Sequence, residues 1–273
     1  MAGVTQLHDV VYVVTSRSSS IRRYSATTHR RLADIVVKGL RDPTDIAACE
    51  LTFQLYVADD RVSVWRVSSD GVDIQRWLTK SRSDTFSPHT VSVTSSRLLV
   101  SSRHTDSQLR QFDAAGGDEL RRVGLPDYME PEHAVESPIR TLIVSYCNRQ
   151  LYSYCPGCDP RTHLDPGQVS EVSTEGQVLR QFSRSLDWPR HIAVDRQGNI
   201  FVADSDKRHI LLLDAQLALR RVITDARQLS YRRPGSLRYV EQRPQRLCYT
   251  EQSGQLLVGF EKGGVAVFDV LQR

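Results

Sequence analysis

A short apolar pattern recurs six times along the chain. Each copy has a branched aliphatic residue, an apolar residue, a valine and then a small residue, except that the first copy ends in Val14. The shared valines are separated by steps of 44, 43, 44, 58 and 56 residues. Such a regular period indicates a chain built from repeated structural units. The six valines are Val13, Val57, Val100, Val144, Val202 and Val258.

A proline lies twelve to fourteen residues before the valine in five of the six copies. Proline suits the first residue of a strand, where no ladder donor is lost. We therefore expect each proline to begin the innermost strand of its repeat. The prolines are Pro43, Pro88, Pro131, Pro189 and Pro244. The first copy has no leading proline, and its candidate inner strand is 3–5.

A third strand is expected after each valine and a fourth strand in five of the six copies, the two being joined in several copies by a glycine-containing turn. The expected third strands are 21–24, 62–67, 109–112, 169–172, 210–213 and 265–270. The expected fourth strands are more polar and cover 32–37, 74–78, 120–123, 178–182 and 219–223. Four strands in a repeat of about 43 residues are typical of a β-propeller blade.

The pattern thus predicts an all-β fold, a six-bladed β-propeller with four-stranded antiparallel blades in one domain, 1–273. The expected blades are approximately 1–40, 41–82, 83–126, 127–184, 185–228 and 229–273. The sixth copy stops after its third strand. Either the last blade has three strands, or flanking sequence that would complete it is missing.

One repeat resembles a known family. Residues 189–213 have a Pro-x-x-Ile-Ala-Val-Asp opening, a glycine turn and Phe-Val-Ala-Asp, as in an NHL repeat, and 55–59 match its middle. The whole chain looks most like uncharacterised NHL propellers of invertebrates and, more distantly, the C-terminal propellers of tripartite-motif ubiquitin ligases. This resemblance implies an NHL-type propeller that binds protein or RNA. The zinc-binding RING of those ligases has no counterpart in 1–273, so we expect no ligase activity.

Positive charge is carried almost entirely by arginine. The net charge is +4, with four lysines against thirty-two arginines. Residues 220–246 hold eight arginines and two acidic residues, with tyrosines interleaved. Arginine beside aromatic rings is the chemistry of single-stranded RNA binding, although a solvated face, an acidic protein partner or a compositional bias of the gene also accounts for it. The candidate ligand-binding residues here are Tyr231, Arg232, Arg233, Arg238 and Tyr239.

Histidines lie beside three of the leading prolines, at His89, His133 and His191. The propeller lyases that finish amidated peptides bind zinc through channel histidines, but the Pro-His pair that this resemblance requires occurs only at His89. Successive strand residues face opposite ways, so the three need not share a centre, and we expect structural histidines. Arg190, His191 and His133 are nevertheless candidate ligand-binding residues, because the start of an inner strand is where a ligand could reach them.

No catalytic constellation is found, so we expect no enzyme. Asp45, Glu132 and Asp195 stand at unlike positions of their repeats and predict no calcium ring. The motif at 155–163 has the spacing of a zinc knuckle, with Cys155, Cys158 and His163, but its last cysteine would fall on a glutamine. Cys147 could supply a fourth ligand. A tight turn with free thiols is the alternative that we favour, and we expect no metal and no cofactor.

The sequence therefore predicts a non-catalytic binding module with a protein partner. Single-stranded RNA is the second hypothesis, and a metal-dependent lyase is the third. The first residues do not form a signal peptide, and no apolar run is long enough to cross a bilayer. Five scattered cysteines, an odd number, are typical of a reduced protein. We expect a cytoplasmic protein without membrane contact, and the sequence leaves its oligomeric state open.

Overall fold

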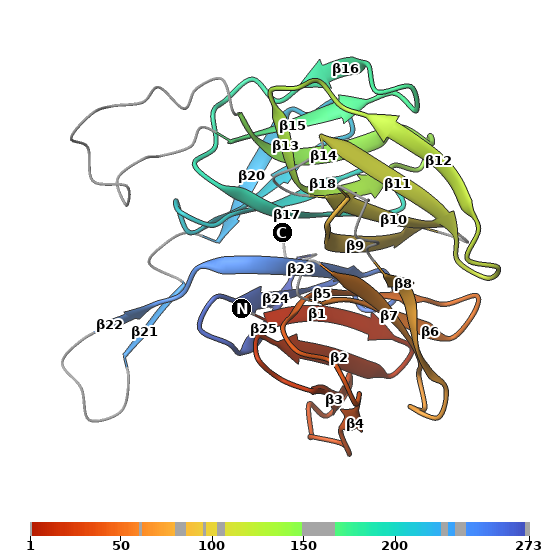
Figure 1. Cartoon of the computed structure of the whole chain (residues 1–273). Coiled ribbons are helices and arrows are strands. Elements are labelled where there is room, and N and C mark those ends of the chain that lie inside the picture. Colours follow the sequence, from red (N-terminus) through yellow and green to blue (C-terminus); the bar gives the residue numbers. More distant parts are fainter. Residues whose placement is uncertain are drawn as a thin grey trace, which may run out of the picture.

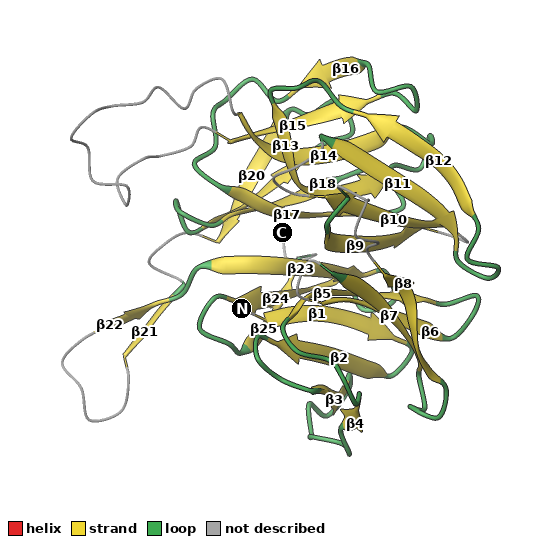
Figure 2. Ribbon diagram, in the orientation of Figure 1, coloured by secondary structure: helices red, strands yellow, loops and turns green. Residues whose placement is uncertain are grey.

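The computed structural model describes residues 2–59, 62–79, 86–94, 97–102, 107–148, 167–224, 229–232 and 239–270. All regular elements in these ranges are β-strands, joined by loops and turns (Figure 2). The same ranges contain no helix long and apolar enough to span a membrane. Six antiparallel sheets follow one another along the chain as the blades of a propeller (Figure 1).

Five blades have four strands and the sixth has three within the described residues. Blade 1 contains β1 (Ala2–Leu7), β2 (Val10–Thr15), β3 (Ser20–Ser25) and β4 (Ile35–Val36). Blade 2 contains β5 (Pro43–Cys49), β6 (Gln54–Asp59), β7 (Ser63–Ser68) and β8 (Ile74–Thr79). Blade 3 contains β9 (Pro88–Thr94), β10 (Arg97–Ser102), β11 (Gln108–Asp113) and β12 (Glu119–Gly124).

The remaining blades follow the same order along the chain. Blade 4 contains β13 (Met129–Glu136), β14 (Leu142–Asn148), β15 (Gly167–Val172) and β16 (Val178–Gln181). Blade 5 contains β17 (Pro189–Val194), β18 (Ile200–Asp204), β19 (His209–Leu213) and β20 (Leu219–Thr224). Blade 6 contains β23 (Pro244–Thr250), β24 (Gln255–Phe260) and β25 (Val265–Asp269). A separate hairpin, β21 (Ser230–Arg232) with β22 (Tyr239–Glu241), precedes blade 6.

The repeated pattern correctly predicts this architecture. All six shared valines lie on second strands and are at most 4% exposed. Four of the five prolines begin an inner strand, while Pro131 is the third residue of β13. The fourth strand of blade 1 is shorter than expected, because only Ile35 and Val36 pair with β3. The β21–β22 hairpin lies in the long step of 56 residues between Val202 and Val258, where the sequence predicted no strand.

The inner strands form a closed ring in the order β1, β5, β9, β13, β17 and β23, with β23 beside β1. Blade 6 therefore lies against blade 1, as the blue and red ribbons show in Figure 1. Every blade turns one apolar face to the next blade, so the hydrophobic core is divided into clusters that each join two neighbours. This arrangement leaves the inner ends of all six blades facing a common axis.

Candidate functional site

The inner strand of each proline-led blade contains the same β-bulge. In β5, Pro43 is paired with Asp59 and Asp45 with Ala58, so Thr44 is an extra residue without a partner opposite. The register shifts at the same place in β9, β13, β17 and β23. A bulge re-aims the side chains that follow it. The residue two places after each proline therefore has an equivalent position in all five blades.

Four of these equivalent residues meet in the centre of the ring. The complete set is Gly3 in blade 1, then Asp45, Thr90, His133, His191 and Arg246 in blades 2 to 6. We call Asp45, His133, His191 and Arg246 the channel cluster. All four side chains are buried. They come from four blades, so tertiary structure alone brings them together.

Asp45 is the hub of the channel cluster. Its Oδ1 lies 3.0 Å from Nε of Arg246, and its Oδ2 accepts a 3.0 Å hydrogen bond from the Val91 N–H. Nε2 of His191 and Nε2 of His133 lie 3.6 and 3.9 Å from the same Oδ2. Burial alone would raise the pKa of Asp45, but the Arg246 guanidinium and both histidines outweigh it and hold this pKa well below its usual range. Asp45 is therefore an anion inside the ring.

The two imidazoles are stacked, with ring centroids 3.6 Å apart and an interplanar angle of 21°. Nδ1 of His133 accepts the Ile192 N–H at 3.4 Å, and Nδ1 of His191 accepts the Leu247 N–H at 3.3 Å. A neutral imidazole has one N–H and one acceptor nitrogen, so each ring carries its proton on Nε2, which faces Asp45. Burial lowers the pKa of both rings, and the neighbouring His191 lowers that of His133 further. Both histidines are neutral at pH 7.

Arg246 connects the last blade of the ring to the blades at its start. Its guanidinium donates to the Thr44 carbonyl at 2.8 Å and to the Gln245 carbonyl at 2.9 Å, besides the contact with Asp45. Blade 1 lies between blades 6 and 2, and its residue at the equivalent position is Gly3, which adds no side chain. A Cβ on Gly3 would lie 3.3 Å from Cα of Asp45. Arg246 thus connects blade 6 directly to blade 2.

Asp45, His133 and His191 also form a set of three metal-ligand types, with one ligand atom of each within 4.8 Å of the others. A metal-bound imidazole normally donates its other N–H to an acceptor. Here the other nitrogen of each ring accepts a backbone N–H, so Nε2 holds the proton and has no lone pair to offer. The Arg246 cation on the same carboxylate further opposes a second cation. The geometry favours a structural cluster.

We therefore predict substoichiometric zinc and other first-row metals in the purified protein, measured by elemental analysis. One metal ion per chain that is lost in the His191→Asn variant would contradict this reading of the channel cluster. One zinc per chain that is lost in Cys155→Ser but kept in His191→Asn would instead support the cysteine motif.

Arg190 belongs to a second contact set beside the channel cluster. Its guanidinium lies over the Trp188 ring at 3.6 Å and its Nη1 is 3.9 Å from Oε2 of Glu132. Trp188 Nε1 donates to Oε1 of Glu132 at 3.0 Å, and the Cys147 thiol lies 3.6 Å from the same oxygen. Since the Arg190 side chain is only 11% exposed, it serves to join blade 5 to blade 4.

The structure thus brings two predicted residues, His133 and His191, to one centre, with Arg190 close by in the sequence. They are only 2% and 6% exposed, so a ligand would have to enter the ring to reach them, and their role in ligand binding stays a prediction. His89 is buried too, but it is the bulged residue of its strand and is not part of the channel cluster.

Other candidates lie wholly or partly outside the described residues. Arg233, Arg238, Cys155, Cys158 and His163 are not described, while Cys147 is buried in β14. In the β21–β22 hairpin the backbone of Arg232 pairs with that of Tyr239, and Tyr231 pairs with Val240.

Sequence reasoning missed Asp45 and Arg246. It compared the histidines with one another and acidic residues with one another, and it assumed unbroken alternation along each strand. The signal was nevertheless present, since both residues stand two places after a proline, as His133 and His191 do. Because the bulge places these positions in register, counting from the proline finds the complete set.

The second strands of blades 2 and 5 end in an Ala-Asp pair, and the aspartate of each pair stabilises a loop. Asp204 Oδ1 accepts the N–H groups of Asp187 and Trp188 at 3.2 and 3.0 Å, which fixes the loop that leads into β17. Asp59 accepts the N–H groups of Arg41 and Asp42 in the same way before β5. These carboxylates therefore stabilise the start of their inner strands.

Comparisons with known proteins agree with the fold. A family model described as a beta-propeller repeat matches residues 179–203. Comparison with curated proteins gives no significant match. Among solved structures, the chain is similar to Kuenenia stuttgartiensis hydrazine synthase, with a TM-score of 0.65 and 12% identity over 99% of this chain and 96% of that one.

Two further solved structures are similar. One is a chain of a nidogen/laminin complex, with a TM-score of 0.64 and 15% identity over 83% of this chain and 81% of that one. The other is a protein of unknown function from Bacteroides caccae, with a TM-score of 0.62 and 16% identity over 90% and 81%. Identities this low show the fold alone. Fold and repeats define the chain as a six-bladed β-propeller protein.

Proposed function

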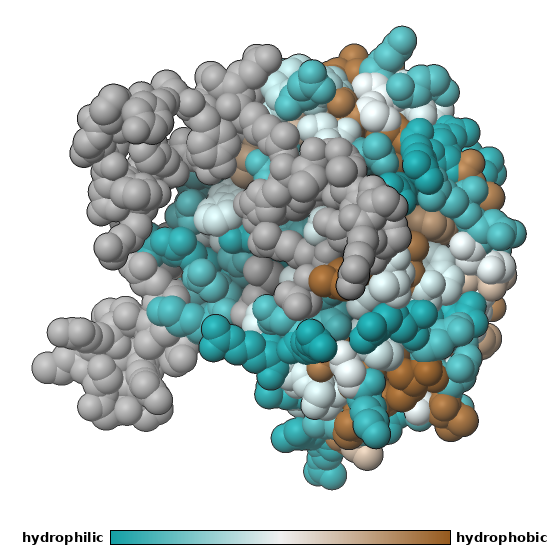
Figure 3. Space-filling view, in the orientation of Figure 1, coloured by the Kyte–Doolittle hydropathy of each residue, from teal (hydrophilic) through white to brown (hydrophobic). Residues whose placement is uncertain are grey.

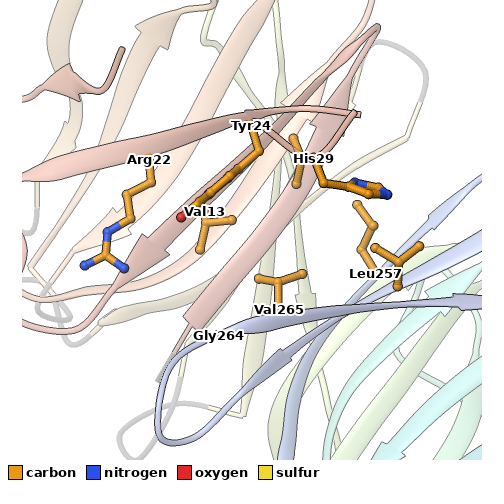
Figure 4. A pocket seen from close by; sticks show the side chains of 9 residues that line it. Val13, Arg22, Tyr24, His29, Leu257, Gly264 and Val265 are labelled. Carbon is orange, nitrogen blue, oxygen red and sulfur yellow. The ribbon is translucent and has the colours of Figure 1, made fainter. Parts of the chain in front are cut away.

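We propose that this propeller is a non-catalytic binding module whose partner is a protein. The observation that carries the proposal is an open pocket of about 250 Å³ at the seam between blades 6 and 1. In Figure 4, Val13 and Tyr24 of blade 1 face Leu257 and Val265 of blade 6 across it. An apolar pocket beside an unpaired strand edge is a place where protein segments bind.

The channel cluster supports a non-catalytic role. Asp45 is neutralised by Arg246 and faced by two imidazole N–H groups, so its charge is already compensated inside the protein. A general base needs a pKa near the working pH and access to substrate, whereas the pKa of Asp45 is strongly lowered and its side chain is buried. These groups hold blades together.

The NHL-type repeat at 189–213 supports the same proposal, since propellers that it resembles bind protein or RNA. On the face in Figure 3, the described surface is mostly hydrophilic with separate hydrophobic patches, as expected of a protein that works in water. We place it in the cytoplasm, where an odd number of scattered cysteines is typical of a reduced protein.

RNA binding is the second candidate. The specific observation is the β21–β22 hairpin, which pairs Arg232 with Tyr239 and so collects part of the arginine-rich segment 220–246 on one element. Arginine and tyrosine are residue types that bind and stack on unpaired bases. An arginine-driven RNA complex would weaken steeply as salt rises.

Affinity capture from the native source, with and without ribonuclease, separates these functions. We expect one protein to be recovered in stoichiometric amount and to survive ribonuclease. In parallel, binding to a random single-stranded RNA pool is measured at rising salt, for the wild type and for Arg232→Ala with Arg233→Ala. Salt-sensitive RNA binding that the double variant loses, with no ribonuclease-resistant protein, would favour RNA and contradict the protein-partner proposal.

A further inference from the structure

The seam pocket lies beside blade 6 at the position where the other blades have a fourth strand. In each of the five complete blades, an apolar side chain on the fourth strand, or just after it, packs into the core cluster shared with the next blade. These side chains are Ile35, Leu78, Val123, Phe182 and Ile223. Blade 6 has no fourth strand in the described residues, and its side of the seam with blade 1 holds the pocket instead.

The cluster at this seam is correspondingly small. Its buried members are Val4, Val11 and Val13 of blade 1 with Leu257 of blade 6, while Val265 and Tyr24 are only partly buried against it. The other five seams each have ten or more buried members. A bulky apolar side chain from a fourth strand would complete the sixth cluster as it completes the others.

The backbone of β25 offers hydrogen-bonding groups for that strand. The Val270 N–H donates to the Gly254 carbonyl, and the Phe260 N–H donates to the Gly264 carbonyl. In an antiparallel ladder, bonded and non-bonded residues alternate, so these bonds turn the N–H and C=O groups of Val265, Val267 and Asp269 away from β24. Within the described residues no strand pairs with this edge.

Charge at the pocket indicates the chemistry of the occupant. Arg22 and His29 lie at its two ends (Figure 4), and none of the described residues that line it carries a carboxylate. The Arg22 guanidinium has no acidic group within ion-pair distance in the described part of the chain. An acidic residue of the occupant would therefore gain a partner, whereas a lysine or arginine would be repelled.

We propose that an extended segment of the protein partner binds β25 as the missing fourth strand of blade 6. It runs antiparallel to β25, as every fourth strand does to its third. An apolar side chain of the segment fills the pocket, and an acidic residue near it pairs with Arg22. This inference rests on the proposed function, because it names the surface that the protein partner uses.

The test is a selection of displayed random peptides on the full chain, with Val267→Pro as the counter-target. Proline removes the outward N–H of Val267, is tolerated on an edge strand and leaves the bonds to β24 in place. We expect recovered peptides to alternate apolar and polar residues and to contain an acid. On binding, hydrogen exchange should slow at the amides of Val265, Val267 and Asp269.

A charge exchange tests whether the acidic residue of the bound peptide lies next to Arg22. For one recovered peptide, replacing its acid with lysine should weaken binding to the wild type by about fivefold, as expected of a lost cross-strand ion pair. Arg22→Glu should reverse this preference, so that the lysine peptide binds better. Arg121→Glu, on the exposed fourth strand of blade 3, is the matched control and should leave both affinities unchanged.

Several outcomes would overturn the proposal. They are recovery of no peptide family, equal binding to Val267→Pro, and a preference that Arg22→Glu does not reverse. A wild-type dimer that becomes monomeric in Val267→Pro would also overturn it, because the occupant would then be a second copy of the chain. If the native partner is captured equally by wild type and Val267→Pro, the protein-binding function stands and only this surface is wrong.

Discussion

Replacing Arg246 with alanine is expected to lower the free energy of unfolding by about 3–5 kcal/mol, the range for removing one partner of a buried ion pair. Arg246 and Asp45 are each about 1% exposed, and their atoms Nε and Oδ1 are 3.0 Å apart. Without the guanidinium, Asp45 would keep a buried charge that, among the described residues, faces the Val91 N–H and two imidazole N–H groups at 3.6 and 3.9 Å. The variant would also lose the hydrogen bonds to the Thr44 carbonyl, which connect blade 6 to blade 2.

The measurement is denaturant unfolding at pH 7, with Arg243→Ala as the matched control. Arg243 precedes the same strand and contacts Asp206 at 2.8 Å, but its side chain is 45% exposed. Exposed ion pairs contribute about 0–1 kcal/mol, so the control should be close to the wild type. The double variant Asp45→Asn with Arg246→Met removes both charges and should recover much of the lost stability. Equal stability of Arg246→Ala and Arg243→Ala would show that the channel cluster does not hold the ring together.

The fold could be predicted from sequence because each blade repeats a strong local signal. The middle positions of the second strands are buried on both faces, so a run of apolar residues recurs there at a nearly fixed period. Proline and glycine mark where strands begin and turn. The prediction is less accurate for short strands. The sequence predicted a longer β4 than the two residues that pair with β3, and it did not predict the β21–β22 hairpin.

The channel cluster was harder to predict because its members are chemically unlike. An aspartate, two histidines and an arginine share only their position relative to a proline. A bulge between proline and side chain breaks the alternation of period two that sequence reasoning relies on. Which nitrogen of each histidine carries the proton depends on the Ile192 and Leu247 N–H groups of the next blade. No pattern within a single strand contains that information.

The seam pocket depends on a comparison between blades. Its walls come from β2, β3, β24 and β25, which are more than two hundred residues apart in the chain. The sequence indicated that the sixth copy ends early, and so predicted a three-stranded blade as one of two alternatives. It could not show that the outer edge of β25 lies beside a small core cluster and Arg22, since this requires the ring to close.

Stability should fall as the pH drops below about 6.5, with a slope of at most about 1.4 kcal/mol per pH unit for each of the two channel histidines. Burial lowers the pKa of His133 and of His191 from the ordinary value of 6.5. Below that value the unfolded chain binds a proton at each imidazole, while the folded chain keeps both neutral. The unfolded state therefore binds more protons, and the free energy of unfolding decreases with falling pH until the folded-state pKa values are reached.

The variant His133→Asn with His191→Asn isolates this effect. The Asn side-chain oxygen can accept the backbone N–H that Nδ1 accepts now, and the titrating groups are gone. The variant is expected to be less stable at pH 7 but to have a smaller slope of unfolding free energy between pH 6.5 and 5. Burial raises the pKa of Asp204, which acts in the opposite direction, but it is present in both proteins and cancels in the difference. If the double variant keeps the wild-type slope, the channel histidines are not the groups that destabilise the fold in acid.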